Sequence, residues 1–167
     1  MTADFATVYR DHLDYAWQSL RRLGVPARDL EDVAHEVFLV VHRRLVDYDT
    51  ARPIRPWLFG IAFRVASDYR RKIARRDGLA SSIDEPARDA SPETAALRQQ
   101  AIAIARRTLE QLDDDARAVF ILAELDGVAV TDIAASLEIP VNTAYTRLRR
   151  ARLAVANAIT GGRDERA

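Results

Sequence analysis

The chain has 167 residues, of which 49% are hydrophobic and 30% are charged, a composition typical of a globular protein rather than a disordered one. Its 25 basic and 25 acidic residues cancel, so the total charge gives no indication of a nucleic-acid partner. The absence of cysteine excludes disulfides and thiolate metal sites. The sequence shows no signal peptide and no apolar run of about 18 residues, which predicts a cytoplasmic protein without membrane insertion.

Apolar residues recur at helical spacing along most of the chain, and no strand-like alternation persists, which predicts an all-α fold. The first helix is expected over residues 5–20 and is ended by Gly24 and Pro26. A second helix is expected to begin at Asp29, whose carboxylate would serve as the N-cap. After a short loop, a third helix is expected to run to Arg76.

The composition changes after residue 76, where serine, proline and acidic residues replace large apolar ones. Residues 77–92 are therefore expected to form a flexible linker. The sequence predicts two small helical domains on either side of it, residues 1–76 and 93–160, followed by a short tail at 161–167.

In the C-terminal domain, Asp113 is the expected N-cap of a helix that ends near Gly127. A shorter helix is expected over residues 131–137, followed by a four-residue turn. The last helix is expected over residues 142–159, and the pair of glycines that follows is expected to stop it.

The last two helices have the pattern of a helix-turn-helix. Seven apolar residues are expected to face inward from its two helices and turn: Ile133, Ala134, Leu137, Ile139, Val141, Ala144 and Leu148. The outward face of the last helix carries Asn142, Thr143, Tyr145, Thr146, Arg149 and Arg150. Arginine can bind guanine in a bidentate manner, and such a helix usually enters the DNA major groove by its N-terminal end. The alternative is a helical hairpin whose arginines are only solvated.

Residues 52–76 contain eight basic residues and one acidic residue, a net charge of +7. Four aromatic residues lie among these cations: Trp57, Phe59, Phe63 and Tyr69. Aromatic side chains can stack on unpaired bases while cations follow the phosphate backbone, which suits melted DNA better than intact duplex. The alternative is that the aromatic residues belong to the core and the arginines solvate a helix end.

Acidic residues gather in two places. Asp29, Glu31, Asp32 and Glu36 open the second helix, where they either complement the helix dipole or form a docking face for a basic partner. Residues 110–138 contain eight acidic residues and one basic residue, a net charge of −7. The total charge of zero therefore hides two basic helices and acidic surfaces.

The segments 29–39, 55–62 and 109–152, in this order, resemble the ECF (extracytoplasmic-function) sigma factors of bacterial RNA polymerase. The first, DLEDVAHEVFL, resembles the region 2 helix that grips the polymerase clamp. The second, RPWLFGIA, is similar to the Trp-Leu-(aromatic)-x-Ile-Ala motif that opens the helix reading the −10 element. The third resembles region 4 and includes the helix-turn-helix.

The resemblance implies a protein that binds core RNA polymerase and directs initiation at promoter DNA, with no enzymatic activity and no cofactor. It also implies an anti-sigma factor as a partner. It assigns polymerase binding to Asp32, His35 and Glu36, the −10 element to Trp57, Arg64, Asp68, Arg71 and Lys72, and the −35 element to Asn142, Thr143, Tyr145, Thr146, Arg147, Arg149 and Arg150.

Three positions depart from the family pattern. His35 stands where the family usually has glutamine, and Arg64 stands where asparagine is frequent and takes part in base capture in some members. Tyr145 stands where many members carry a basic residue. The base preferences of the family are therefore not carried over to Arg64 or Tyr145.

Two other classes of protein compete with this interpretation. A stand-alone regulator with a helix-turn-helix would bind DNA without polymerase, and the basic, aromatic helix at residues 57–76 argues against it. An enzyme would need a nucleophile with its base or a glycine-rich phosphate loop, and the sequence contains neither. His12, His35 and His42 are too scattered for a metal site.

Overall fold

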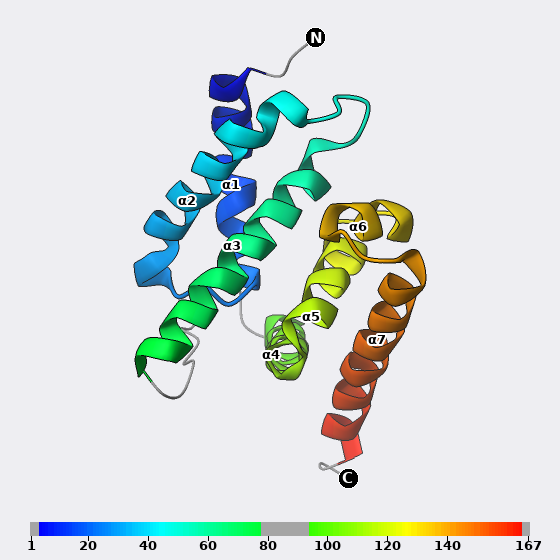
Figure 1. The fold of residues 1–167 in the computed structure, drawn as a ribbon. Coiled ribbons are helices and arrows are strands. Elements are labelled where there is room, and N and C mark those ends of the chain that lie inside the picture. Colours follow the sequence, from blue (N-terminus) through cyan, green and yellow to red (C-terminus); the bar gives the residue numbers. More distant parts are fainter. Residues whose placement is uncertain (1–3, 78–93, 165–167) are drawn as a thin grey trace. The chain divides into compact units, whose positions relative to one another are not determined.

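The computed structural model describes residues 4–77 and 94–164. Helices connected by turns and short loops make up these residues, with no strand among them, which confirms the all-α class. They belong to two compact units, one built on the helices before residue 78 and one on the helices after residue 93 (Figure 1). The predicted linker, apart from its first residue, lies outside the described residues.

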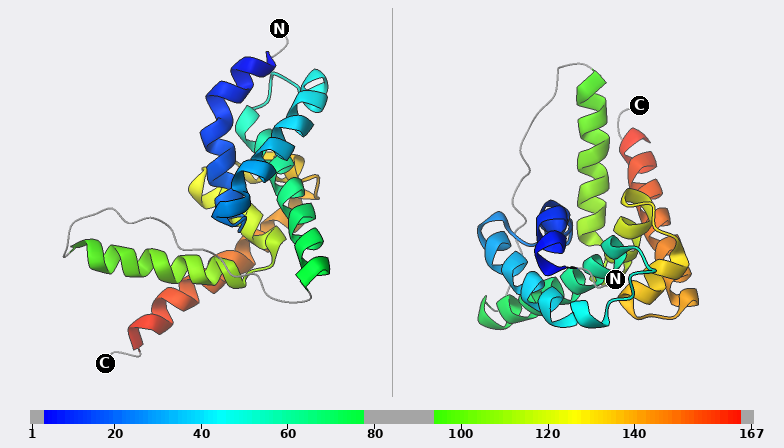
Figure 2. Two further views of the ribbon diagram at one scale, coloured as in Figure 1. Left: turned by 90° about the vertical axis from the view of Figure 1, so that its left-hand side faces the viewer. Right: turned by 90° about the horizontal axis from the view of Figure 1, so that it is seen from above.

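The N-terminal unit consists of three helices that each pack against the other two (Figures 1 and 2). These are α1 (Phe5–Arg22), α2 (Leu30–Arg44) and α3 (Ile54–Asp77). Short 3-10 turns, Ala27–Asp29 and Leu45–Asp47, lie at the two ends of α2. The three-helix arrangement follows the apolar spacing of the sequence.

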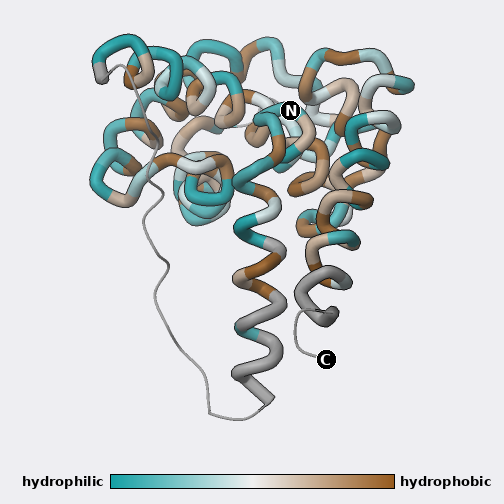
Figure 3. Tube along the Cα trace, turned by 90° about the horizontal axis from the view of Figure 1, so that it is seen from below, coloured by the Kyte–Doolittle hydropathy of each residue, from teal (hydrophilic) through white to brown (hydrophobic). Residues whose placement is uncertain are grey.

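The core of this unit is formed by one apolar face of each helix, and Figure 3 shows hydrophobic positions alternating with hydrophilic ones along the helical trace. Because a helix turns once in 3.6 residues, residues three and four apart share a face. The buried side chains follow this spacing and include Ala16, Leu20, Val33, Val37, Val41, Leu58, Ile61 and Ala62.

Helix α1 ends where the sequence predicts, at Gly24, which has a φ of 88°. The N–H of Gly24 donates to the carbonyl of Arg21, and the N–H of Val25 donates to the carbonyl of Leu20, both at 3.0 Å. This pair of hydrogen bonds satisfies the last helical carbonyls and requires a left-handed residue, a conformation that glycine adopts without steric cost.

The predicted capping role of Asp29 is wrong. Asp29 precedes α2, but its side chain makes no capping hydrogen bond. Its carboxylate instead accepts a hydrogen bond of 2.6 Å from the hydroxyl of Tyr69 on α3. A tertiary partner 40 residues away has therefore replaced the local one, and the bond connects the start of α2 to the C-terminal half of α3.

The C-terminal unit is built around α7 (Val141–Asp164), which packs against both α4 (Thr94–Gln111) and α5 (Asp114–Phe120). A π-helical turn, η3 (Ile121–Leu125), continues α5. Helix α6 (Val130–Leu137) precedes α7. Figure 2 shows the long helices α4 and α7 of this unit running alongside each other.

Asp113 caps α5 as predicted, because its carboxylate accepts a hydrogen bond of 2.8 Å from the N–H of Ala116. The segment that follows α5 also ends where predicted, at Gly127, which has a φ of 66°. A Cβ built on Gly127 would meet no atom within 4 Å.

We expect Gly127→Ala to lower the free energy of unfolding by about 1 kcal/mol, since the left-handed conformation is the only obstacle to a side chain there. Chemical denaturation of the wild type and the variant measures this change. A matched control is Ala129→Gly, an exposed position just before α6. An unchanged or higher stability for Gly127→Ala would contradict the expected strain.

The turn between α6 and α7 confirms the helix-turn-helix prediction. Glu138 ends α6 with a φ of 58°, and the N–H of Ile139 donates to the carbonyl of Ala134 at 2.9 Å. This is the same left-handed stop found after α1, here with a residue other than glycine. It reverses the chain so that α7 begins at Val141.

The prediction that the last helix stops at the glycine pair 161–162 is wrong, since α7 continues to Asp164. The predicted tail therefore begins within a helix. A glycine in a helix interior costs only about 1 kcal/mol relative to alanine, and it ends a helix when it takes a left-handed conformation. Neither glycine has a positive φ here.

The one basic residue in the acidic segment 110–138, Arg117, is 7% exposed and lies on α5, with its side chain against the C-terminal end of α4. Its guanidinium donates hydrogen bonds to the carbonyls of Leu109, Glu110 and Leu112 at 2.7, 2.8 and 3.2 Å. Asp114 lies 3.7 Å from the same group. Burial lowers the pKa of Arg117, but its cation is matched to the negative end of the α4 dipole.

Candidate nucleic-acid and partner-binding surfaces

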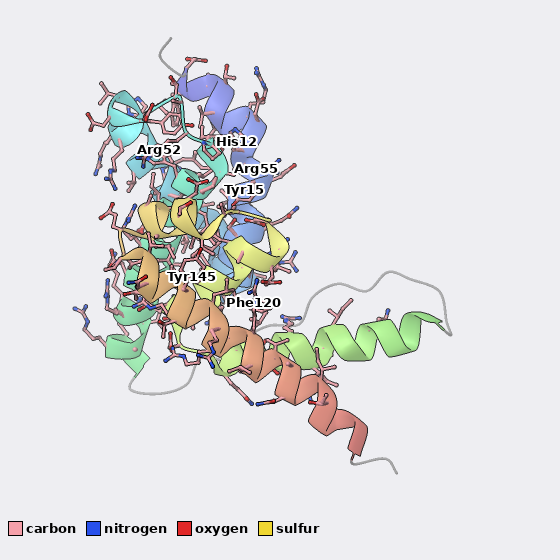
Figure 4. All side chains as sticks on the ribbon, turned by 90° about the vertical axis from the view of Figure 1, so that its right-hand side faces the viewer. His12, Tyr15, Arg52, Arg55, Phe120 and Tyr145 are labelled. Carbon is pink, nitrogen blue, oxygen red and sulfur yellow. The ribbon has the colours of Figure 1, made fainter. Side chains whose placement is uncertain are left out.

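The outward face of α7 presents most of the side chains that the sequence predicts for DNA contact. Tyr145 is 56% exposed and projects from α7 in Figure 4. Asn142, Thr146, Arg149 and Arg150 are also exposed, whereas Thr143 and Arg147 are half-buried. The hydroxyl of Thr146 donates to the carbonyl of Asn142 at 2.9 Å. The helix therefore carries an accessible polar face over its first turns.

The inward face of the helix-turn-helix is confirmed at Ile133, Ala134, Leu137, Ala144 and Leu148, which are all buried. Ile139 in the turn is half-buried. The prediction for Val141 is wrong, because this residue is 39% exposed. Val141 is the first residue of α7, at a solvent-exposed end of the helix.

Three arginines of α7 are held by carboxylates of the same unit. Arg147 lies 2.7 Å from Asp115, and Arg150 forms an ion pair with Asp113. Further along, Arg152 lies 2.6 Å from Glu124. Among the described residues, Arg149 has no carboxylate at ion-pair distance, so its charge is the most accessible of the four.

A groove runs between the start of α5 and the start of α7. It is lined by Asp113, Asp115, Asn142, Thr143, Thr146, Arg147 and Arg150. Five of these seven residues are predicted DNA contacts, and the other two are the aspartates. The sequence gives no signal for this pairing, because it joins residues about 30 positions apart.

On α2, the structure brings together the residues that the resemblance assigns to polymerase binding. Asp32, His35 and Glu36 are all exposed, and their spacing of three and four residues puts them on one face. Asp32 and Glu36 form the acidic wall of a second groove. Its basic wall is on α3, and its full lining is Asp29, Asp32, Val33, Glu36, Tyr69, Lys72, Ile73, Arg75 and Arg76.

The predicted −10 residues of α3 differ in accessibility. Asp68, Arg71 and Lys72 are exposed, while Trp57 and Arg64 are half-buried. Arg71 and Asp68 form an ion pair on the helix surface. An exposed pair of this kind contributes little to stability.

The aromatic residues of α3 are less available than the sequence predicts. Phe59 has no exposed surface, which favours the core alternative for this side chain. Trp57 packs against Tyr48 with ring centroids 4.8 Å apart, and Tyr69 is engaged with Asp29.

A cationic and aromatic cluster at the start of α3 was not predicted. Arg55 lies over the ring of Tyr15 on α1, 5.3 Å from its centroid. His12 lies on the same helix as Tyr15, and Figure 4 labels both residues beside Arg55. Burial, and then the charge of Arg55, lower the pKa of His12. The sequence shows that Arg55 is basic, but it does not indicate that Tyr15 and His12 of α1 lie beside it.

Among the described residues, no group of three histidine, cysteine, aspartate or glutamate side chains could hold a metal ion. In the same part of the chain, no helix combines the length and apolar character that crossing a membrane requires.

Comparison with known families assigns both units. Residues 8–76 match the model of Sigma-70 region 2, and residues 102–155 match the model of Sigma-70 region 4. The first match covers most of α1 to α3, and the second covers the helix-turn-helix. The fold and these surfaces thus define a transcription initiation factor of the sigma type.

The chain belongs to the ECF sigma factors. It is 32% identical over 146 residues to the ECF RNA polymerase sigma-E factor of Escherichia coli K12, a match that covers 81% of this chain and 76% of the relative. The RNA polymerase sigma-H factor of Pseudomonas aeruginosa is also 32% identical over 146 residues, with 80% of this chain and 74% of the relative covered.

Solved structures show the same fold. The sigma factor RpoE of Bartonella quintana, crystallised with the anti-sigma factor NepR, matches with a TM-score of 0.75 and 21% identity over 94% of this chain and 97% of RpoE. CnrH, in complex with the cytosolic domain of CnrY, matches with a TM-score of 0.64 and 26% identity over 94% of this chain and 88% of CnrH.

Proposed function

We propose that the two units of this ECF sigma factor have different roles. In the N-terminal unit, α2 docks on core RNA polymerase and α3 holds the melted −10 strand. In the C-terminal unit, α7 reads the −35 duplex. The observation that carries the proposal is the distribution of charge over accessible faces. An acidic face on α2 and a basic run on α3 occur in one unit, and an exposed polar face on α7 occurs in the other.

The polymerase-binding role is given to Asp32, His35 and Glu36. Their shared exposed face on α2 supports it, because two carboxylates four residues apart suit a basic surface on the partner. His35 stands between them where the family usually has glutamine, and it keeps the ability to donate a hydrogen bond.

The −10 role is given to Arg71, Lys72 and Asp68 at the accessible end of α3, with Trp57 and Arg64 nearer its start. Cations along one helix can follow the phosphates of a single strand, and the free energy of those contacts offsets the few kcal/mol needed to unstack a base. Trp57 has a partly exposed ring that rests on Tyr48, which supports a stacking role for this side chain.

The −35 role is given to α7, entering the major groove by its N-terminal end. Tyr145, Thr146 and Arg149 are the residues proposed to contact base edges, because they are exposed on the first three turns. Asn142, Thr143, Arg147 and Arg150 line the neighbouring groove and are proposed to contact the backbone or flanking bases.

We further propose that the chain acts in the cytoplasm, where polymerase and promoters are found, and that it performs no bond chemistry of its own. An anti-sigma factor is a proposed partner as well. Two relatives in fold support it, since RpoE and CnrH were solved with NepR and with the cytosolic domain of CnrY.

The test is reconstitution with sigma-free core RNA polymerase. We expect the purified chain to co-elute with core on a sizing column and to start transcription from a subset of a promoter library that shares a −35 and −10 pair. Salt-sensitive binding to duplex DNA without any association with core would instead identify a stand-alone regulator and reject the proposal.

A further inference from the structure

The arginines of α7 are unequally available to DNA, and the structure identifies the cause. Of the four arginines between Val141 and Arg152, three form ion pairs inside the C-terminal unit. Among these three, Arg147 and Arg150 are nearer to the N-terminal end of the helix, and both are paired with aspartates at the start of α5. That end is the one proposed to enter the major groove.

The positions of the two aspartates matter as much as the pairing. Asp113 and Asp115 line the same groove as Asn142, Thr143 and Thr146, three of the proposed DNA contacts. Their side chains are 51% and 47% exposed, so they are open to solvent. A phosphate that approached Arg147 or Arg150 would therefore meet a carboxylate already bound to the same guanidinium.

We propose that Asp113 and Asp115 compete with DNA phosphates for Arg150 and Arg147, and so lower the affinity of α7 for DNA of any sequence. Phosphate contacts supply most sequence-independent affinity, whereas contacts to base edges supply specificity. Pairing the two arginines internally weakens binding to every sequence, while Tyr145 and Arg149 remain exposed. This phosphate term is shared by all sequences and cancels from the difference in binding free energy that sets specificity, so the competition limits affinity.

This inference rests on the proposed function of α7 as the DNA-reading helix, and it is tested without polymerase. The probe is a fluorescent 20-base-pair duplex of arbitrary sequence, titrated with the full chain at several salt concentrations. The variant is Asp115→Asn, and its matched control is Glu110→Gln. Both remove one negative charge from the C-terminal unit, but Glu110 pairs with Arg106 on α4.

Each arginine released to a phosphate should make the slope of log K against log salt steeper by about 0.9. We therefore expect Asp115→Asn to bind the arbitrary duplex roughly 5- to 10-fold more tightly than the wild type at about 0.1 M salt, with a steeper slope. Glu110→Gln should change affinity by less than about twofold. The gain should vanish when Arg147→Ala is added to Asp115→Asn.

Asp113→Asn provides an independent second variant. Asparagine caps helices as well as aspartate does, so α5 keeps its cap while Arg150 loses its partner. Equal effects of Asp115→Asn and Glu110→Gln, or no tighter binding by either aspartate variant, would overturn the inference. If the aspartate variants bound more tightly but no promoter were used with core polymerase, the competition would stand and the proposed sigma-factor role of α7 would not.

Discussion

Replacing Arg117 with alanine is expected to destabilise the C-terminal unit by about 3 kcal/mol or more, one of the largest effects of any single substitution in this chain. The guanidinium supplies hydrogen bonds to three carbonyls at the end of α4, those of Leu109, Glu110 and Leu112. Alanine would remove these donors, so that the carbonyl of Leu109 would keep only the N–H of Leu112, and it would also remove a cation from the negative end of the helix.

Thermal unfolding followed by circular dichroism measures this effect. For a unit of about 70 residues, the expected loss corresponds to a decrease in Tm of roughly 12–24 °C. Arg117→Lys should recover only a small part of it, because an ammonium group on a flexible stem cannot reproduce a planar fork of donors.

The matched control for this prediction is Arg106→Ala. Arg106 lies on α4 itself and pairs with Glu110 at 3.4 Å, but both side chains are about one-third exposed. Such a pair contributes roughly 0.5 kcal/mol. Similar stabilities for Arg106→Ala and Arg117→Ala would show that the carbonyl contacts of Arg117 are not what holds α4 in place.

Asp32→Arg is expected to abolish co-elution with core RNA polymerase, with a loss of affinity of at least about 100-fold. The change replaces an attraction across the proposed interface with a repulsion, and like charges brought together at an interface cost several kcal/mol. Asp32 is exposed on the face it shares with Glu36, so the variant should fold normally. Sizing chromatography with core polymerase measures the loss.

Glu31→Arg separates this effect from a general change of charge. Glu31 is the neighbouring acidic residue in the first turn of α2 and is also exposed, but it does not line the groove between α2 and α3. We expect this variant to retain most of its affinity for core. Retention of binding by Asp32→Arg, or an equal loss for both variants, would refute the assignment of Asp32 to the interface.

The helices were predictable because their signals are local. Gly24 and Gly127 end helices, Asp113 caps one, and apolar residues at helical spacing become buried. The failures arise where tertiary structure overrides a local signal. Asp29 is a residue type that often caps helices, but its carboxylate accepts a hydrogen bond from Tyr69, 40 positions away. The glycine pair at 161–162 lacks the left-handed conformation that would end α7.

The candidate site was predictable as a set of residue types rather than as an arrangement. The sequence identifies the polar face of α7 by its spacing, and the structure confirms that Tyr145 and Arg149 are exposed. It could not reveal that Arg147 and Arg150 meet Asp115 and Asp113, since ion pairs between separate helices have no fixed spacing. The sequence shows Arg117 only as the single basic residue of an acidic segment, whereas in the structure it is buried and donates to the last carbonyls of α4.

The π-helical turn η3 has a consequence for changes in chain length. The N–H of Asp126 donates to the carbonyl of Ile121, five residues earlier, whereas an α-helix would use the carbonyl four residues earlier. The turn thus holds one residue more than a regular helical turn. We expect evolution to tolerate loss of a single residue here better than inside α5 or α6, because the deletion would regularise the helix and spare the elements on either side.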